Sequence, residues 1–303
     1  MKIKVKKKEI CAIIVHYYSN IKKFKKVIKL HSVNFSKIII INNSPKINIK
    51  DLENYKITVI NNNKNIGLAK AINAGITLAK KNFIYFALFD QDSLIKKNFL
   101  NNMVKYMNIF YEQKKFLHIE PLVFSPVYYN KIIDEEAKHI RFKTLRLLRE
   151  NNNIKKLFSF PEYVITSGSI IPKSSINKVG LMDEKLFIDF IDIEWCLRAK
   201  RFNKVPIIFN KVRINHFIGD YFVKIFKNKY PIHNPLRMYY YFRNSIYLYK
   251  KEYISINWKV VDLSRNIFRI LFYLLFVNKK RKYFKHIILG IIHGLKNKMY
   301  KYK

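Results

Sequence analysis

Short apolar runs alternate with amphipathic segments along the first third of the chain. The runs are continuously apolar, which is typical of strands buried on both faces of a parallel sheet. The segments between them carry apolar residues three and four positions apart, which predicts helices. The predicted strands are residues 10–15, 37–41, 56–60 and 83–89, and the predicted helices are 21–30 and 69–81. This order predicts a doubly wound α/β domain that binds ligands beyond the carboxyl ends of its strands.

The middle of the chain is less regular. Residues 94–153 predict one long helix followed by a polar connection, IIDEEAKHIRFKT. A second organised block starts at Tyr163. It predicts a strand and turn at 163–172, a short helix at 174–179, a longer helix at 189–201 and a strand at 204–210.

From about His233 the chain becomes aromatic, aliphatic and basic at helical spacing, which predicts two or three helices. The best candidate for a membrane span, 267–277, is interrupted by Arg269 and would cover about 16 Å as a helix, roughly half of a hydrocarbon core, so no span is predicted. Such basic apolar helices can lie in the headgroup plane of an anionic leaflet, pack on the rest of the chain, or form a subunit interface. We therefore expect an α/β domain, residues 1–235, and a C-terminal basic helical region, residues 236–303.

Composition adds a large positive charge to this picture. Half of the 303 residues are hydrophobic, which excludes a disordered or collagen-like chain, and the formal net charge is +39. That charge favours a polyanionic partner, namely nucleic acid, an anionic membrane or a phosphorylated ligand, although lysine-rich codon usage is an alternative source. Cys11 and Cys196 lie in apolar stretches, which predicts buried free thiols. With no recognisable signal-peptide cleavage site, a reducing, cytoplasmic location is expected.

Two carboxylates follow the predicted strand 83–89. Asp90 and Asp92 stand at positions i and i+2 in a loop, where both can face one pocket. Oxygen ligands of this kind suit Mg²⁺ or Mn²⁺, which in turn neutralise a diphosphate. A D-x-D sequence alone is also common in ordinary turns.

A segment of small residues precedes that strand, reading NIGLAKAINAG from Asn65 to Gly75. Gly67 would let the backbone turn sharply before the helix, and the small side chains permit close packing against the sheet or a ligand. Asn65 could cap the helix, and Asn73 could bond a loop.

Polar residues also end another predicted strand. Asn42 and Asn43 follow residues 37–41, where side-chain amides could read the edge of a base or form an ordinary turn.

The predicted helix 189–201 carries a carboxylate in an apolar setting. Asp192 lies among Phe190, Ile191, Ile193 and Trp195, so it must be paired, shifted upward in pKa, or functional. Further along, His216 ends the segment VRINH, where a lone histidine is either structural or a ligand.

These segments, in this order, resemble the family 2 inverting glycosyltransferases with the GT-A fold, and among them the bacterial rhamnosyltransferases. The GT-A fold is a Rossmann-like, mostly parallel sheet flanked by helices. The matching segments are AIIVHYYSN at 12–20, INNS at 41–44, 65–75, 90–92, TSGSIIP at 166–172, FIDFIDIEWCLRAK at 187–200, HFIG at 216–219 and RMYYYFRN at 237–244.

The resemblance implies roles for individual residues. Asp90 and Asp92 would bind a divalent metal, Mg²⁺ or Mn²⁺, and the diphosphate, and His216 would complete the site as in some relatives. Asp192 falls at the position of the catalytic base. Asn42 stands where relatives usually carry an aspartate for the pyrimidine base. The donor-binding residues implied are Asn42, Asn43, Asn65, Gly67, Asn73 and Asp90.

The resemblance also implies an activity. A sugar, by family likeness L-rhamnose from dTDP-β-L-rhamnose, would pass with inversion to a hydroxyl of a cell-surface polysaccharide or lipid-linked glycan. The enzyme would lie at the inner face of the cytoplasmic membrane, and no oligomeric state is assigned. One alternative is a UDP-hexose donor on the same fold. A more distant one is a nucleic-acid-binding protein, for which the chain lacks zinc ligands and an RNP-type motif.

Overall fold

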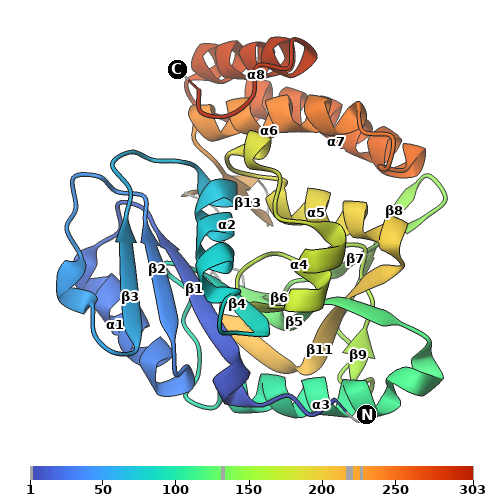
Figure 1. Ribbon diagram of the computed structural model, residues 1–303. Coiled ribbons are helices and arrows are strands. Elements are labelled where there is room, and N and C mark those ends of the chain that lie inside the picture. The colour runs from blue at the N-terminus through green and yellow to red at the C-terminus, as the bar shows by residue number, and fades with distance from the viewer. Residues whose placement is uncertain (1–2, 131–133, 216–220, 226–227, 303) are drawn as a thin grey trace.

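A computed structural model describes residues 3–130, 134–215, 221–225 and 228–302 (Figure 1). Its centre is a nine-stranded sheet with the order β3-β2-β1-β4-β10-β5-β11-β9, with β6 paired to β5. These strands are β1 Ile10–His16, β2 Ile38–Asn42, β3 Ile57–Asn61, β4 Tyr85–Asp90, β5 Glu120–Asn130, β6 Glu135–Glu136, β9 Phe158–Ser159, β10 Ser169–Pro172 and β11 Lys204–Asn215. Two hairpins lie outside the sheet, β7 His139–Lys143 with β8 Arg146–Glu150, and β12 Tyr221–Ile225 with β13 Asn228–Ile232.

Helices cover both faces of the sheet. In chain order, the helices of the described residues are α1 Ile21–Asn34, α2 Leu68–Ala79, α3 Phe99–Leu117, α4 Lys173–Val179, α5 Ile191–Ala199, α6 Pro235–Tyr249, α7 Ile256–Phe276 and α8 Lys280–Leu295. Short 3-10 turns occupy Lys7–Glu9, Lys50–Leu52, Glu184–Leu186 and Lys200–Phe202. The central sheet flanked by helices confirms the predicted α/β fold.

Strand β1 shows why its sequence is continuously apolar. Ile13 and its alternate neighbours join the core cluster that contains α2 and α5. Ile14 and its alternate neighbours join the cluster that contains α1 and α3. Because successive side chains of a strand point to opposite faces, a strand covered on both faces must be apolar at every position.

The parallel strands all end at one edge of the sheet. Strands β2, β1 and β4 run parallel to one another, as do β5 and β11. Strand β10 lies between β4 and β5 and runs antiparallel to both. The amino end of β10 therefore meets the carboxyl ends of its neighbours, which is where ligands bind in open α/β sheets.

The middle of the chain differs from the prediction. The segment 94–153 contains, besides the expected helix, the long strand β5 and the hairpin β7–β8, so the predicted polar connection was wrong in part. Strand β5 contains Pro126, which predicts against a central strand, but the register of β11 shifts between Phe209 and Arg213, next to this proline. The irregularity accommodates a residue that has no N–H to donate.

The end of the chain forms three helices, as expected. Helix α8 lies at the outer end of the molecule in Figure 1 and packs closely on α6. A Cβ atom at Gly290 would lie 2.5 Å from the carbonyl oxygen of Tyr239, so only glycine permits this approach. Within the described residues, none of the helices combines the length and apolar character that crossing a bilayer requires. The division at residue 235 stays a prediction.

Candidate active site

Polar side chains gather where the parallel strands end. His16, Asn42 and Asn61 lie side by side in register at the ends of β1, β2 and β3, and Asp90 ends β4. The turn before β10 meets the same edge, because the backbone N–H of Asp90 donates to the hydroxyl of Ser167 at 3.3 Å. One edge of the sheet therefore combines residues from both halves of the chain.

Asp90 and Asp92 lie in a loop held by this turn. The Ser93 hydroxyl bonds the Ser167 hydroxyl, and Asp90 is half-buried whereas Asp92 is exposed. Among the described residues, no three His, Cys, Asp or Glu side chains form a group that could ligate a metal. Two carboxylates fit Mg²⁺ or Mn²⁺ if substrate phosphates supply further oxygens, which is how Mg²⁺ is commonly held.

His216 lies outside the described residues, so its predicted role as a metal ligand stays a prediction. The residue before it, Asn215, ends β11 and forms an isolated bridge with Leu94. Leu94 follows Asp92 by two residues, so this part of β11 approaches the D-x-D loop.

Asp192 lies in the first turn of α5, and its carboxylate accepts a hydrogen bond from the N–H of Ile193 at 2.9 Å. Burial raises the pKa of Asp192 to about 6; the backbone N–H groups that it accepts from act against this rise, and the negative charges of Asp189 and Asp90 contribute to it. A carboxylate with such a pKa is largely ionised at pH 7 yet can take up a proton during a reaction.

The turn before β10 joins Asp192 to the D-x-D loop. A small cavity of about 20 Å³ is lined by Asp192 together with Thr166, Ser169 and Trp195. Ser167 lies between Thr166 and Ser169 in this turn, and its hydroxyl accepts the hydrogen bond from the Asp90 N–H. The same turn, residues 166–169, therefore adjoins both carboxylates.

Gly67 makes the turn that the sequence predicts. Its φ is +87°, and a Cβ atom there would lie 2.5 Å from the ring of Phe187. The N–H of Leu68 donates to the carbonyl of Phe187 at 2.6 Å, which ties α2 to the segment before α5. Asn65 differs from expectation, because Gly67 is the N-cap residue of α2 and Asn65 instead accepts from the Gly67 N–H at 2.9 Å.

Asn42 and His16 form a buried network. The Asn42 oxygen lies 2.9 Å from His16 Nδ1 and accepts from the N–H of Ser44, and its amide nitrogen donates to Ile47 and Asn61. Burial lowers the pKa of His16. A ligand could bond Asn42 only by replacing one of these contacts, so its base-binding role stays a prediction. His16 was not singled out from the sequence, although its place at a strand end is a signal.

Asn43 and Asn73 also bond within the protein. Asn43 donates to the carbonyl of Gly67 at 3.2 Å and accepts from Asn62 at 2.9 Å, which fixes the turn before α2. Asn73 is bonded in both directions to the backbone of Met182, which confirms that it bonds a loop. Their predicted contacts with a donor stay predictions, as do those of Asn65 and Gly67.

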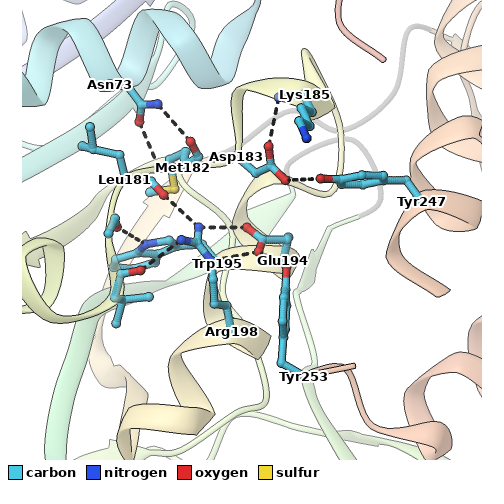
Figure 2. Close-up of polar contacts among 12 residues, drawn as sticks. Asn73, Leu181, Met182, Asp183, Lys185, Glu194, Trp195, Arg198, Tyr247 and Tyr253 are labelled. Carbon is cyan, nitrogen blue, oxygen red and sulfur yellow. Dashed lines mark hydrogen bonds and ion pairs between the residues drawn. The ribbon is translucent and has the colours of Figure 1, made fainter. Parts of the chain in front are cut away.

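Figure 2 shows the segment between α4 and α5 held from three helices. Asn73 of α2 bonds Met182, and Tyr247 of α6 donates to Asp183 at 2.8 Å. Arg198 of α5 donates to the carbonyl of Leu181 at 2.8 Å and is paired with the buried Glu194 at 2.9 Å. This segment leads directly to Asp192, so its position determines where that carboxylate lies.

Comparison with known proteins bears on the fold and on the class of enzyme. Residues 13–111 match the family described as "Glycosyl transferase family 2". Over 297 residues the chain is 29% identical to dTDP-rhamnosyl transferase RfbF of Shigella flexneri, which covers 95% of each chain. The crystal structure of GalNAc-T7 with UDP, GalNAc and Mn²⁺ matches with a TM-score of 0.53 at 13% identity, covering 85% of this chain. The chain spans 54% of that larger protein, and the match concerns the fold.

The fold and these matches define the chain as a glycosyltransferase with a GT-A-like fold. More narrowly, its first third matches family 2, and over most of its length the chain is similar to a rhamnosyltransferase.

Proposed function

We propose that this enzyme transfers L-rhamnose from dTDP-β-L-rhamnose to a hydroxyl of a polysaccharide or lipid-linked glycan, with inversion at the anomeric carbon. The relative named as a dTDP-rhamnosyl transferase supports the choice of donor. The observation that carries the proposal is the common turn, residues 166–169, which contacts both the D-x-D loop and the surroundings of Asp192.

In this proposal Asp192 is the catalytic base. Its carboxylate removes the proton of the acceptor hydroxyl while that oxygen attacks the anomeric carbon from the face opposite the diphosphate. The bond to the diphosphate oxygen breaks in the same displacement, so the configuration inverts and no covalent enzyme intermediate forms. The raised pKa of Asp192, about 6, matches a base that works near neutral pH.

Asp90 and Asp92 would hold Mg²⁺ or Mn²⁺, and His216 is a third candidate ligand. A divalent ion bound there would supply positive charge against the diphosphate. The chemistry of the donor set supports this assignment, because both side chains are carboxylates on the loop that follows β4.

The donor would lie along the ends of β1, β2 and β4. Gly67 lets the amino end of α2 pack against Phe187, and Asn43 and Asn65 shape the turn that precedes this helix. We propose that Asn42 and Asn73 act mainly by holding this wall, since their amide groups already have partners in the protein. A UDP-hexose is the alternative donor for the same site.

The acceptor and the location belong to the same proposal. We place residues 1–235 as the catalytic domain, residues 236–303 as a helical region, and the enzyme at the inner face of the cytoplasmic membrane. The +39 charge and the basic helices support an anionic surface as partner.

A thermal-shift panel of nucleotide sugars, with and without Mn²⁺, tests the donor. We expect dTDP-rhamnose with Mn²⁺ to raise the melting temperature more than any UDP-hexose, because a ligand that binds the folded state stabilises it. A larger shift with a UDP-hexose would overturn the rhamnosyl assignment. Full transfer activity in EDTA would overturn the metal assignment.

A further inference from the structure

The outer faces of α7 and α8 are apolar and exposed. Their exposed side chains recur every three or four residues, so each set forms a row along its helix. The row on α7 includes Phe268, which is 71% exposed, and the row on α8 includes Phe284 and Leu295. The full set is Ile256, Val260, Leu263, Ile267, Phe268, Leu271, Leu275 and Phe276 on α7, and Phe284, Ile288, Ile292 and Leu295 on α8.

The inner face of α7 fixes which way this row points. Asp262 accepts from Ser245 at 2.7 Å and from Tyr249 at 2.8 Å, both on α6. Asn266 donates to Ser245 at 3.0 Å, and Trp258 joins the core on the α2 side of the sheet. Asp262 and Asn266 thus fix the inner face of α7, and turning the helix would break their buried hydrogen bonds.

Positive charge lies at the end of the apolar rows where α7 passes into α8. Lys279, just before α8, and Lys280, Arg281 and Lys282 in its first turn are exposed. The only acidic residue from position 253 onward is Asp262, which is buried. A cavity of about 490 Å³ beside the turn is lined in part by Lys279 and Lys282.

We propose that the outer faces of α7 and α8 dock on an anionic phospholipid leaflet. The apolar rows enter the boundary between headgroups and acyl chains, and the lysines of the turn meet headgroup phosphates. A second copy of the chain fits this face less well, because a two-fold interface would bring two equally basic turns together. The proposal deepens the proposed function by naming the surface that brings the enzyme to a lipid-linked acceptor.

Flotation tests this surface without any sugar donor. Vesicles of phosphatidylcholine with phosphatidylglycerol should carry the full chain upward, and vesicles of pure phosphatidylcholine should carry about tenfold less. The double variant Phe268→Gln, Leu275→Gln should lose about tenfold of the binding, because two apolar side chains leave the interface. The matched control is Tyr55→Gln, a change at an equally exposed aromatic residue away from these helices.

Equal flotation of the double variant and the control would overturn the docking proposal. A dimer in sedimentation that the double variant dissociates would assign the face to a second copy instead. Transfer to a short soluble acceptor should stay within twofold in the double variant. Docking can therefore fail while the proposed reaction stands.

A second inference rests on the backbone just before Asp192. Phe187, Asp189 and Phe190 have φ values of +65°, +61° and +64°, a region that non-glycine residues rarely adopt. Such a conformation is unfavourable and persists only where the surrounding structure holds the residue in it.

Two buried neighbours on α6 supply that hold. The amide nitrogen of Asn244 donates to the carbonyls of Leu186 at 2.9 Å, Ile188 at 2.7 Å and Asp189 at 3.0 Å. Arg243 donates to the carbonyl of Leu186 at 2.8 Å and to the Asn244 oxygen at 2.8 Å, which fixes the orientation of the amide.

We infer that Arg243 and Asn244 are positioning residues that hold the strained turn and thereby set the position of the Asp192 carboxylate. Arg237 of the same helix adds a bond from its Nη2 to the Asp189 carboxylate at 3.0 Å. This assigns a task to the segment 237–244, in which arginine and asparagine reach the backbone of the loop that precedes the proposed base.

Asn244→Leu tests the inference, because leucine has a similar size and no N–H donors. We expect kcat to fall by about 10–100-fold with the donor KM within twofold, and the acid limb of the pH profile to shift, since Asp192 changes its surroundings. The matched control is Ser245→Ala, which loses a buried hydrogen bond to α7 and leaves the turn untouched. It should lower stability but keep kcat and the pH profile.

If Asn244→Leu does not fold, Arg237→Gln provides the second variant. We expect a smaller fall in kcat, again with the donor KM within twofold of the parent. Parent-like kcat and pH profile in a folded Asn244→Leu enzyme would overturn the inference. The variant Asp192→Asn tests the proposed reaction separately. If that variant were active, Asp192 would not be the catalytic base, but the positioning of the turn by Arg243 and Asn244 would still stand.

Discussion

The turn before α5 and the outer face of α7 are opposite cases within one chain. In the turn, carbonyl oxygens of a strained backbone are met by donors from Arg243 and Asn244. On α7, large apolar side chains such as Phe268 are exposed to solvent. The carbonyl groups of the turn find their hydrogen-bond donors within the chain. The apolar side chains of α7 have no such cover within the part of the chain that the structure describes, and in our proposal a phospholipid leaflet covers them. Changes in the first region should alter the reaction, and changes in the second should alter location.

Asp192→Asn should have the largest effect, a loss of transfer activity with no change in vesicle binding. Removing general-base assistance should lower transfer by about 10²–10⁴-fold, because an amide cannot accept the acceptor proton. Nucleotide-sugar binding in a thermal-shift assay and flotation with anionic vesicles should both be unchanged. Activity within twofold of the parent would show that Asp192 is not the base.

The next largest effect should be that of pH, which we expect to change the rate of transfer but not vesicle binding. The base works only when ionised, and its pKa is raised to about 6. The kcat value should therefore fall about tenfold per pH unit below 6 and level off above it. Flotation over the same range should not decrease, since lysines stay protonated. A flat rate profile from pH 4.5 to 7 would contradict the assignment.

Gly67→Ala should show how tightly the turn is packed. Its positive φ and the contact with Phe187 predict a loss of about 1–3 kcal/mol in the free energy of unfolding. Denaturant unfolding measures this loss, and Lys70→Ala, an exposed change on the same helix, provides the control. Equal stability of the two variants would mean that the turn adapts freely.

Phe268→Gln should have the smallest effect on stability. Replacing an exposed side chain on the surface changes the free energy of unfolding by about 0.5 kcal/mol at most. Chemical denaturation should therefore match the parent, while vesicle binding weakens. A loss above about 2 kcal/mol would show that this face is part of the core.

Most of the fold could be predicted from the sequence because its first half has the simple pattern of buried strands and amphipathic helices. Strand β5 could not, because Pro126 argues against a central strand and the compensating register shift lies on β11, a strand distant in sequence. The β7–β8 hairpin turns at Thr144 with φ +45°, without the Asn-Gly or Asp-Gly signal that marks such turns.

The site was predictable to a different extent. The small residues from Asn65 to Gly75 predicted a close approach, and the structure shows Gly75 against Ile13 and Gly67 against Phe187. The bonds of Asn42 and the donors of Asn244 were not predictable, because their partners lie on other elements. Spacing along the chain reveals which residues can share an edge, and only the packed structure reveals which polar groups remain for a ligand.

The reversed strand β10 has a consequence for how such an enzyme can diversify. It brings a turn from the later half of the chain beside a loop of the earlier half. We expect the part that chooses the sugar nucleotide and the part that chooses the receiving alcohol to be exchangeable separately. A chimera joined at this strand would let one half be reprogrammed while the other keeps its task.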